Sequence, residues 1–428
     1  MQRSDPRYQQ YVSILKEELV PAMGCTEPIA IAYAAATCRD VLGGIPDSIR
    51  LSVSSCIIKN CKSVVVPNTN GRKGMEAALA IGTVAGDPSA KMQVISGIHE
   101  DIDDRLTAFL KDTPIEIEQA NSDLMFLIEV FMKRSEDTAS VRIENFHTNI
   151  TDIIKNGQTI FHGVSDCTTD SRTEHTDRSI LSVSGIWDFA TTADLDDVRE
   201  VLSRQIDYNS ALSEEGMKNP WGACIGQILL EESHDDIRLL ARAYAAAGSD
   251  ARMSGCELPA VILSGSGNQG ITATMPVLVY AKKLGSSEDS ILRALILSDL
   301  ITVHQKSGIG SVSAFCGATC AGIGAGCGIA YLMGGDMKTI CHTIVNALAI
   351  ISGMICDGAK PSCAAKISAA VDAGLMGYYM YAHGQQFYGG DGIVKKGVEN
   401  SIDSMAEIAR EGMRETNERI LDVMMEDN

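Results

Sequence analysis

The feature that most constrains this chain is a stretch without charged residues, 307–335, in its second half. Its length alone would allow a transmembrane helix. The stretch is, however, rich in Gly, Ala, Ser and Cys and poor in Leu, Ile, Val and Phe, and it has neither an aromatic belt nor a flanking basic cluster. We therefore expect a buried helix in close contact with neighbouring backbones, and no membrane span.

The hydrophobic periodicity of the sequence changes near residue 190. Before that point, helical runs alternate with β-rich segments. The helical runs are 8–19 and 74–86, and the β-rich segments are 49–66, 92–98, 115–120, 124–132, 140–147 and 158–164. After that point helical periodicity dominates, up to a stripe over 397–425. The pattern predicts an α+β fold: an N-terminal α/β sandwich-like domain over residues 1–190 and an all-helical domain over residues 191–428.

Charge and cysteine usage restrict the function further. With 36 Lys and Arg against 55 Asp and Glu, the net charge is −19, which argues against binding to nucleic acid or to anionic lipid. The opening sequence MQRSDPRYQQ lacks the apolar region of a secretory signal, so we expect a cytoplasmic protein. In a reducing compartment, 13 cysteines indicate metal binding or catalysis more than disulfides, although most of them can be small buried hydrophobes.

Three cysteines are the strongest candidates for a metal site. Cys356 and Cys363 flank a loop with Gly358 and Pro361, and Cys316 comes from the uncharged stretch. Thiolates favour zinc or iron–sulfur clusters, and three ligands leave an open position, as a catalytic centre needs. Unliganded buried thiols are the alternative interpretation. The other cysteines competing for the ligand role are Cys320, Cys327 and Cys341.

A tight turn, MGCTEP, precedes an expected helix near the N-terminus. It contains Gly24, Cys25, Thr26 and Glu27. A helix N-terminus lowers the pKa of a thiol and attracts carboxylates, so Cys25 is a candidate base or nucleophile, or part of an anion site. A plain helix cap is the alternative.

A second polar loop, LSGSGNQGI, follows an apolar run. It offers backbone N–H groups and short polar side chains that suit a carboxylate or a phosphate, although it lacks the order of a nucleotide-binding loop. An ordinary glycine turn would look similar. Its candidate substrate-binding residues are Ser264, Ser266, Asn268 and Gln269, and basic or amide residues elsewhere add Lys59, Asn60, Arg72 and His147.

The motifs GCTEP, SGSGNQG and CDGAKPSCAAK, in this order, resemble the L-cysteine desulfidase family, which is related to the iron–sulfur L-serine dehydratases. The resemblance covers nearly the whole chain. It implies an oxygen-sensitive [4Fe–4S] cluster, no pyridoxal phosphate, and a helical domain that binds the cluster. It also implies that Cys316, Cys356 and Cys363 are the ligands and that Cys25 acts near the substrate.

The expected function is a carbon–sulfur lyase that eliminates sulfide from L-cysteine and yields pyruvate and ammonia. In this hypothesis Cys25 acts as a thiolate base, while Gly24, Thr26, Glu27 and the loop residues position the substrate. A homodimer is expected from the apolar helical domain. Alternatives are an L-serine dehydratase with the same cluster, a pyridoxal-phosphate lyase using Lys360 or Lys366, and a non-enzymatic iron–sulfur protein that binds an amino acid.

Overall fold

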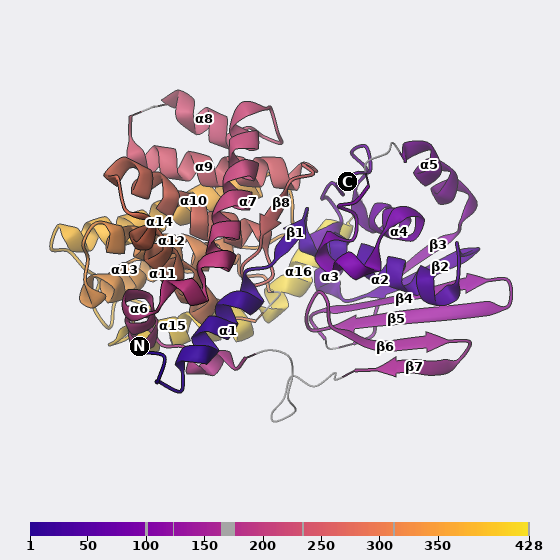
Figure 1. The fold of residues 1–428 in the computed structure, drawn as a ribbon, viewed down its shortest axis with the longest axis horizontal. Helices are drawn as coiled ribbons and strands as arrows, with labels where there is room; N and C mark the ends of the chain where they lie inside the picture. The colour runs from indigo at the N-terminus through magenta and orange to yellow at the C-terminus, as the bar shows by residue number, and fades with distance from the viewer. Residues whose placement is uncertain (99–101, 123, 164–175, 233–234, 311–312, 427–428) are drawn as a thin grey trace.

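The computed structural model describes residues 1–98, 102–122, 124–163, 176–232, 235–310 and 313–426. Its first half contains a six-stranded sheet in which β2 and β3 are parallel and all other neighbours are antiparallel (Figure 1). In spatial order the strands are β3 (Ile115–Gln119), β2 (Ser48–Val53), β4 (Leu127–Arg134), β5 (Asp137–Glu144), β6 (Ile150–Lys155) and β7 (Gln158–His162).

Helices cover one face of this sheet. They are α2 (Thr26–Leu42), α3 (Ser55–Cys61), α4 (Gly74–Ala85) and α5 (Asp103–Asp112). Alternate side chains of β4, namely Ile128, Val130 and Met132, are buried toward α2, as the two-residue period of a strand requires. Among the described residues the arrangement is therefore two layers, with the helices on one face of the sheet (Figure 1).

The second half of the molecule is helical. Its helices are α6 (Val183–Thr192), α7 (Arg199–Lys218), α8 (Ile225–Glu232), α9 (Ile237–Met253), α10 (Gly267–Leu284), α11 (Glu288–Ser307), α12 (Ala318–Leu332), α13 (Met337–Ile350), α14 (Cys363–Ala382), α15 (Val398–Glu407) and α16 (Arg414–Met425). This half and the sheet half together confirm the α+β fold that the sequence predicts.

Helix α12 lies at the centre of the helical half and is built from the uncharged stretch. It packs against α10, α11 and α14. A Cβ added at Gly322 would lie 2.3 Å from the carbonyl oxygen of Ala370, so only glycine allows this approach of α14. The prediction of a buried, closely packed helix is thus confirmed. None of the described helices is both long enough and apolar enough to cross a bilayer.

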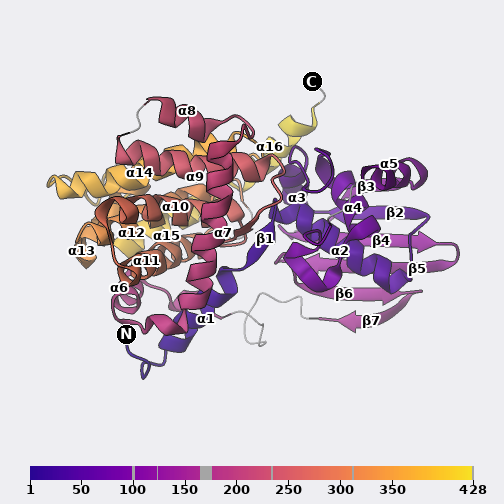
Figure 2. The ribbon, with the colours of Figure 1, turned by 45° about the horizontal axis from the view of Figure 1, so that its top comes forward.

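The N-terminal helix packs in the helical half of the molecule, and the C-terminal helix packs on the sheet half. Helix α1 (Tyr8–Glu18) belongs to the helical core, where the rings of Tyr8 and Tyr11 each lie 5.3 Å from that of Phe189. At the other end, α16 packs on α3 and places Leu421 in the core of the sheet half (Figures 1 and 2). A short antiparallel pair, β1 (Pro21–Met23) and β8 (Pro259–Val261), also joins the halves. The boundary at residue 190 stays a prediction.

Two local expectations were wrong. Residues 55–61 form helix α3 within the segment expected to be β-rich. Residues 92–98 lie at the end of a 3-10 helix (Pro88–Gln93) and in a turn, without strand pairing. The helical stripe predicted over 397–425 is confirmed, as two α-helices joined by a π-helical turn (Ile408–Gly412).

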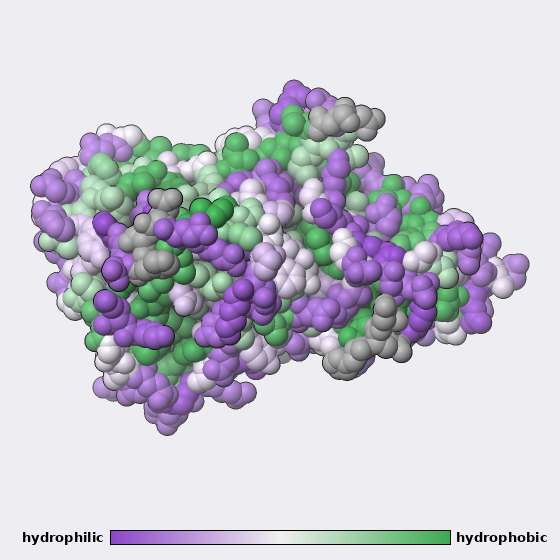
Figure 3. All heavy atoms as spheres, turned by 90° about the horizontal axis from the view of Figure 1, so that it is seen from above, coloured by the Kyte–Doolittle hydropathy of each residue, from purple (hydrophilic) through white to green (hydrophobic). Residues whose placement is uncertain are grey.

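The surface seen from above mixes hydrophilic and hydrophobic side chains over both halves (Figure 3). The described part of that face therefore offers no single large apolar area, and the homodimer stays a prediction.

The helical core contains a buried carboxyl group, Asp299 on α11. It is fully buried and accepts one hydrogen bond, from Gln205 Nε2 at 2.9 Å. Burial raises its pKa to about 7. The folded state therefore keeps a proton that the unfolded chain releases near pH 4, so the stability attributable to this group falls as the pH rises from about 4 to about 7.

We expect Asp299→Asn to remove that fall and to raise the free energy of unfolding above pH 7 by on the order of 2 kcal/mol. Urea unfolding midpoints at pH 5 and pH 8 measure the effect. Asp289→Asn is the matched control, since Asp289 is on the same helix with a side chain 68% exposed. Equal pH responses of the two variants would contradict the prediction.

Candidate active site

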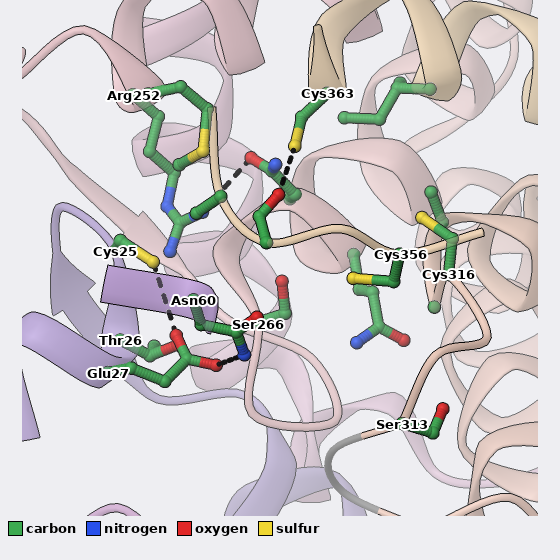
Figure 4. A pocket seen from close by; sticks show the side chains of 18 of the residues that line it. Cys25, Thr26, Glu27, Asn60, Arg252, Ser266, Ser313, Cys316, Cys356 and Cys363 are labelled. Carbon is green, nitrogen blue, oxygen red and sulfur yellow. Dashed lines mark hydrogen bonds between the residues drawn. The ribbon is translucent and has the colours of Figure 1, made fainter. Parts of the chain in front are cut away.

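A cavity of about 110 Å³ lies between the two halves of the molecule (Figure 4). The sheet half contributes the start of α2 and Asn60 of α3, and the helical half contributes the rest. The predicted residues that line it are Cys25, Thr26, Glu27, Asn60, Ser266, Asn268, Gln269, Cys316, Cys356 and Cys363. The structure thus brings together the three sequence motifs, which lie far apart along the chain.

The positive ends of four helices meet at this cavity. Helices α2, α10, α12 and α14 begin directly after Cys25, Ser266, Gly317 and Ser362. No side chain at these four N-cap positions accepts a hydrogen bond from its own helix. Helix N-termini carry partial positive charge and unpaired N–H groups. Although the chain is strongly acidic overall, this cavity therefore favours anions and thiolates.

One wall of the cavity carries a paired thiol and carboxylate. Cys25 Sγ donates to Glu27 Oε2 at 3.2 Å, and the other carboxylate oxygen accepts from Asn60 Nδ2 at 2.8 Å. Burial disfavours the Glu27 carboxylate, but the His147 ring and the hydrogen bonds from Cys25 and Thr26 outweigh it and hold the pKa of Glu27 below its usual value. The pair therefore consists of a thiol donor and a carboxylate acceptor.

This pairing corrects the expectation that Cys25 is a thiolate. Burial raises the pKa of Cys25 well above its usual value, and the negative charge of Glu27 raises it further. The start of α2 and the nearby Arg252 oppose this shift without reversing it. Burial and the Glu27 charge therefore favour the protonated form of Cys25, and Glu27 Oε2 is the acceptor to which its thiol is hydrogen-bonded.

The opposite wall carries the three predicted ligand cysteines. Cys316 and Cys356 lie next to a single bridge between two loops, the antiparallel pair of Phe315 and Ile355, and Cys363 is the first residue of α14. A hydrogen bond from the Cys316 thiol, helped by the positive charge of Lys59, lowers the pKa of Cys356 to about 5. One thiolate is thus already favoured on this wall at neutral pH.

The donor set of this wall fits an iron–sulfur cluster better than a single metal ion. Across the described parts of the chain, no three His, Cys, Asp or Glu side chains are grouped closely enough to hold one ion. In a cluster, by contrast, each cysteine binds a different iron, so thiols spread along a cavity wall are suitable ligands. The buried Lys306, which also lines the cavity, and Lys59 behind it supply positive charge for the thiolates.

Three predicted substrate-binding residues lie behind the cavity wall. Gly24 precedes Cys25 with a φ of +67°, a conformation that favours glycine, and so sets the turn into α2. Lys59 is buried and donates from Nζ to Asn417 Oδ1 at 2.6 Å. His147 is half-buried, and its buried Nε2 has no hydrogen-bond partner among the described residues. These three support the site without lining it.

The structure does not bring two other predicted residues to the cavity. Arg72 forms an ion pair with Asp103 and donates a hydrogen bond to Thr107, both on α5. Ser264 has a left-handed backbone, and its N–H donates to Glu18 Oε2 at 2.9 Å, so it shapes the loop. Both residues satisfy local contacts that the loop composition alone did not reveal.

Sequence reasoning missed several residues that line the cavity, above all Arg252 and Lys306. Each is a buried cation, 2% and 5% exposed respectively. The available signal was a basic residue in a segment otherwise suited to burial: Arg252 ends the alanine-rich α9, and Lys306 directly precedes the uncharged stretch. Other lining residues outside the predicted set are Met253, Ser313, Phe315, Gly317, Ala318, Gly358, Ala359 and Ile367.

Gly358 fixes the loop between Cys356 and Cys363. Its φ is +91°, and a Cβ there would lie 2.1 Å from the carbonyl oxygen of Lys59 in α3. We expect Gly358→Ala to displace this loop and to lower the free energy of unfolding by about 2 kcal/mol or more. Urea unfolding measures the change, and Gly353→Ala is the control because a Cβ there meets nothing within 4 Å. A variant as stable as the control would contradict this prediction.

Comparisons with known proteins agree with this site. A family model described as serine dehydratase alpha chain matches residues 90–422. The chain is 53% identical over 425 residues to a UPF0597 protein of Desulfitobacterium hafniense (strain Y51), covering 99% of this chain and 98% of that protein. It is 46% identical over 419 residues to a UPF0597 protein of Lachnoclostridium phytofermentans, covering 98% and 100%. The chain belongs to the serine dehydratase alpha chain family.

Membership confirms the predicted kinship with serine dehydratases and suggests a dehydratase-like enzyme of the lyase type. Proteins of this family are typically iron–sulfur proteins, in agreement with the three-cysteine wall. The family match describes the class of enzyme, and the geometry of the cavity bears on its substrate.

Proposed function

We propose that this protein eliminates sulfide from L-cysteine and forms pyruvate and ammonia, with a [4Fe–4S] cluster held by Cys316, Cys356 and Cys363. The observation that carries the proposal is a single small cavity with the thiol–carboxylate pair of Cys25 and Glu27 on one wall and the three cysteines on the other (Figure 4). A volume of about 110 Å³ is that of a small site, in keeping with a small amino acid.

The proton chemistry is assigned to Cys25 and Glu27. The proton on the α-carbon of an amino acid is weakly acidic, so its removal needs a positioned base. Cys25 Sγ passes its own proton to Glu27 Oε2, over 3.2 Å, and then accepts the α-proton. The electron pair of the broken Cα–H bond forms the double bond to Cβ while the Cβ–S bond breaks. Sulfide and aminoacrylate result, and water hydrolyses the imine form of aminoacrylate to pyruvate and ammonia.

The remaining wall residues position the substrate and exclude water. Ser266, Asn268 and Gln269 surround the start of α10 and supply hydroxyl, amide and backbone donors. When bound, a [4Fe–4S] cluster with three protein ligands supplies an iron with an open position, a Lewis acid for an oxygen or sulfur atom.

L-Serine is the second candidate substrate, because the matching family is described as serine dehydratase alpha chain. The same residues would remove the α-proton, and hydroxide would leave in place of sulfide. The two candidates therefore differ in the leaving group alone, and one assay separates them.

The test is release of sulfide and pyruvate from L-cysteine by protein reconstituted anaerobically with iron and sulfide. Equal yields of both products, lost in a chelator-treated sample, are the expected result. Pyruvate from L-serine but not from L-cysteine would favour the second candidate. A sample with full iron content and no product from either amino acid would overturn the lyase and favour a protein that only binds amino acids.

A further inference from the structure

One buried cation in the cavity forms no ion pair with any described residue, although the Glu27 carboxylate lines the same cavity. Arg252 is the penultimate residue of α9, and its side chain is 2% exposed. Its Nη1 donates to Asn268 Oδ1 at 3.1 Å, whereas Nε and Nη2 are buried and have no hydrogen-bond partner among the described residues. A guanidinium carries five donors and stays charged, so leaving two of its nitrogens unsatisfied is costly unless a ligand binds there.

The surroundings hold this guanidinium in place. A Cβ on Gly267 would lie 2.3 Å from Arg252 Nε, so the first residue of α10 must be glycine to leave room for the side chain. Asn268, the next residue, accepts the hydrogen bond from Nη1. The start of α10 therefore holds the Arg252 side chain in position, and it adds its own partial positive charge beside the guanidinium. In Figure 4 the Arg252 guanidinium is directed toward the side of the cavity that holds Cys25.

Charge and geometry together define the ligand. Two free guanidinium nitrogens beside a helix N-terminus suit a planar anion with two oxygens. The α-carboxylate of an amino acid has this form, and the cavity of about 110 Å³ is a small one. Held there, the carboxylate would lie in the same cavity as the Cys25 thiol, which the Arg252 guanidinium faces (Figure 4).

We propose that Arg252 binds the α-carboxylate of the substrate and thereby restricts the site to small α-amino acids. This inference rests on the proposed function, and it names the group that selects the substrate. Gly267 and Asn268 are positioning residues, because they act through the placement of the guanidinium.

Binding of L-alanine tests the proposal, because L-alanine has the carboxylate but no leaving group. L-Alaninamide, which lacks the carboxylate charge, is its matched probe. Calorimetry on the reconstituted protein is expected to show that Arg252→Gln weakens L-alanine binding on the order of 10- to 100-fold and leaves the weak L-alaninamide binding nearly unchanged. Arg252→Lys is expected to bind L-alanine with an affinity between those of the wild type and Arg252→Gln, since lysine restores the positive charge but not the two parallel N–H donors of a guanidinium.

Two further variants separate this role from a structural one. Gly267→Ala keeps the guanidinium but displaces it, so it is expected to weaken L-alanine binding while leaving iron content unchanged. Arg242→Gln is the control, because Arg242 lies on the same helix outside the cavity and pairs with Asp372 at 3.3 Å.

The outcomes are distinct. Equal weakening of L-alanine and L-alaninamide, or unchanged binding of both, would overturn the carboxylate role. Loss of iron in Arg252→Gln with normal L-alanine binding would show that the guanidinium serves the cluster instead. Turnover of L-cysteine that is independent of Arg252 would overturn this inference and leave the proposed function standing. Arg252-dependent binding of L-alanine without turnover of L-cysteine or L-serine would support this inference and overturn the proposed function.

Discussion

Cys356→Ser is expected to lose the cluster and the elimination activity together. A serine hydroxyl is a far weaker ligand for iron than a thiolate, and Cys356 is the wall cysteine whose pKa is lowered, to about 5. After anaerobic reconstitution we expect iron content and visible absorbance to fall to the level of the chelator-treated protein. Product release should fall below detection, which corresponds to a loss of at least about a thousandfold.

Cys341→Ser is the matched control for this prediction. Cys341 lies on α13, partly buried and outside the cavity, so its substitution should preserve both iron and turnover. Full iron retention in Cys356→Ser would remove Cys356 from the ligand set. Loss of iron in both variants would indicate a general defect of reconstitution, and circular dichroism of the two proteins would then identify unfolding as its cause.

Cys25→Ser is expected to keep the cluster and to reduce kcat by a factor of about 10² to 10⁴, the usual contribution of a positioned base. The hydroxyl can still donate to Glu27, so the loop should keep its shape, but it is a much poorer proton acceptor than a thiolate. Iron content, kcat and KM for L-cysteine measure the result. A lowered kcat with normal iron and little change in KM would place Cys25 in the chemical step.

Cys38→Ser provides the comparison for Cys25. Cys38 lies on α2, which begins directly after Cys25, and it is also buried. Its thiol donates to the carbonyl oxygen of Ala139 at 3.3 Å and is not part of the cavity. This variant should retain turnover. If Cys25→Ser had the turnover of the wild type, proton transfer would have to be assigned to another residue, with Glu27 the first to be substituted.

Much of the fold could be predicted from periodicity, because the helical half and the paired strands 127–134 and 137–144 follow their hydrophobic patterns. The exceptions have physical causes. Residues 55–61 contain isoleucine and cysteine that would suit a strand, yet packing against α16 makes them a helix. This helix matters for the site, since it directs Asn60 into the cavity and Lys59 toward Asn417.

The candidate site was predictable where its residues lie in loops with unusual composition. Cys25, Asn268 and Cys356 each belong to such a motif, and all three line the cavity. Arg252 and Lys306 were missed because a single cation on a helix produces no periodic signal; only the folded structure shows that it is buried. Conversely, Arg72 looked suitable in the sequence, but its ion pair with Asp103 holds it on α5.

Because the C-terminal helix α16 packs on the N-terminal sheet half, the order of synthesis affects when that half can finish folding. Lys59 emerges early from the ribosome, but its partner Asn417 lies on the last helix, which also donates from Asn417 Nδ2 to Cys56 Sγ at 3.2 Å. Domains fold largely as units, starting from the N-terminal side during synthesis. The sheet half therefore becomes complete only when α16 has packed on α3, where Asn417 accepts the hydrogen bond from Lys59. The three cysteines proposed as cluster ligands all precede α16 along the chain, so the surroundings of the proposed cluster site are complete only when α16 has packed.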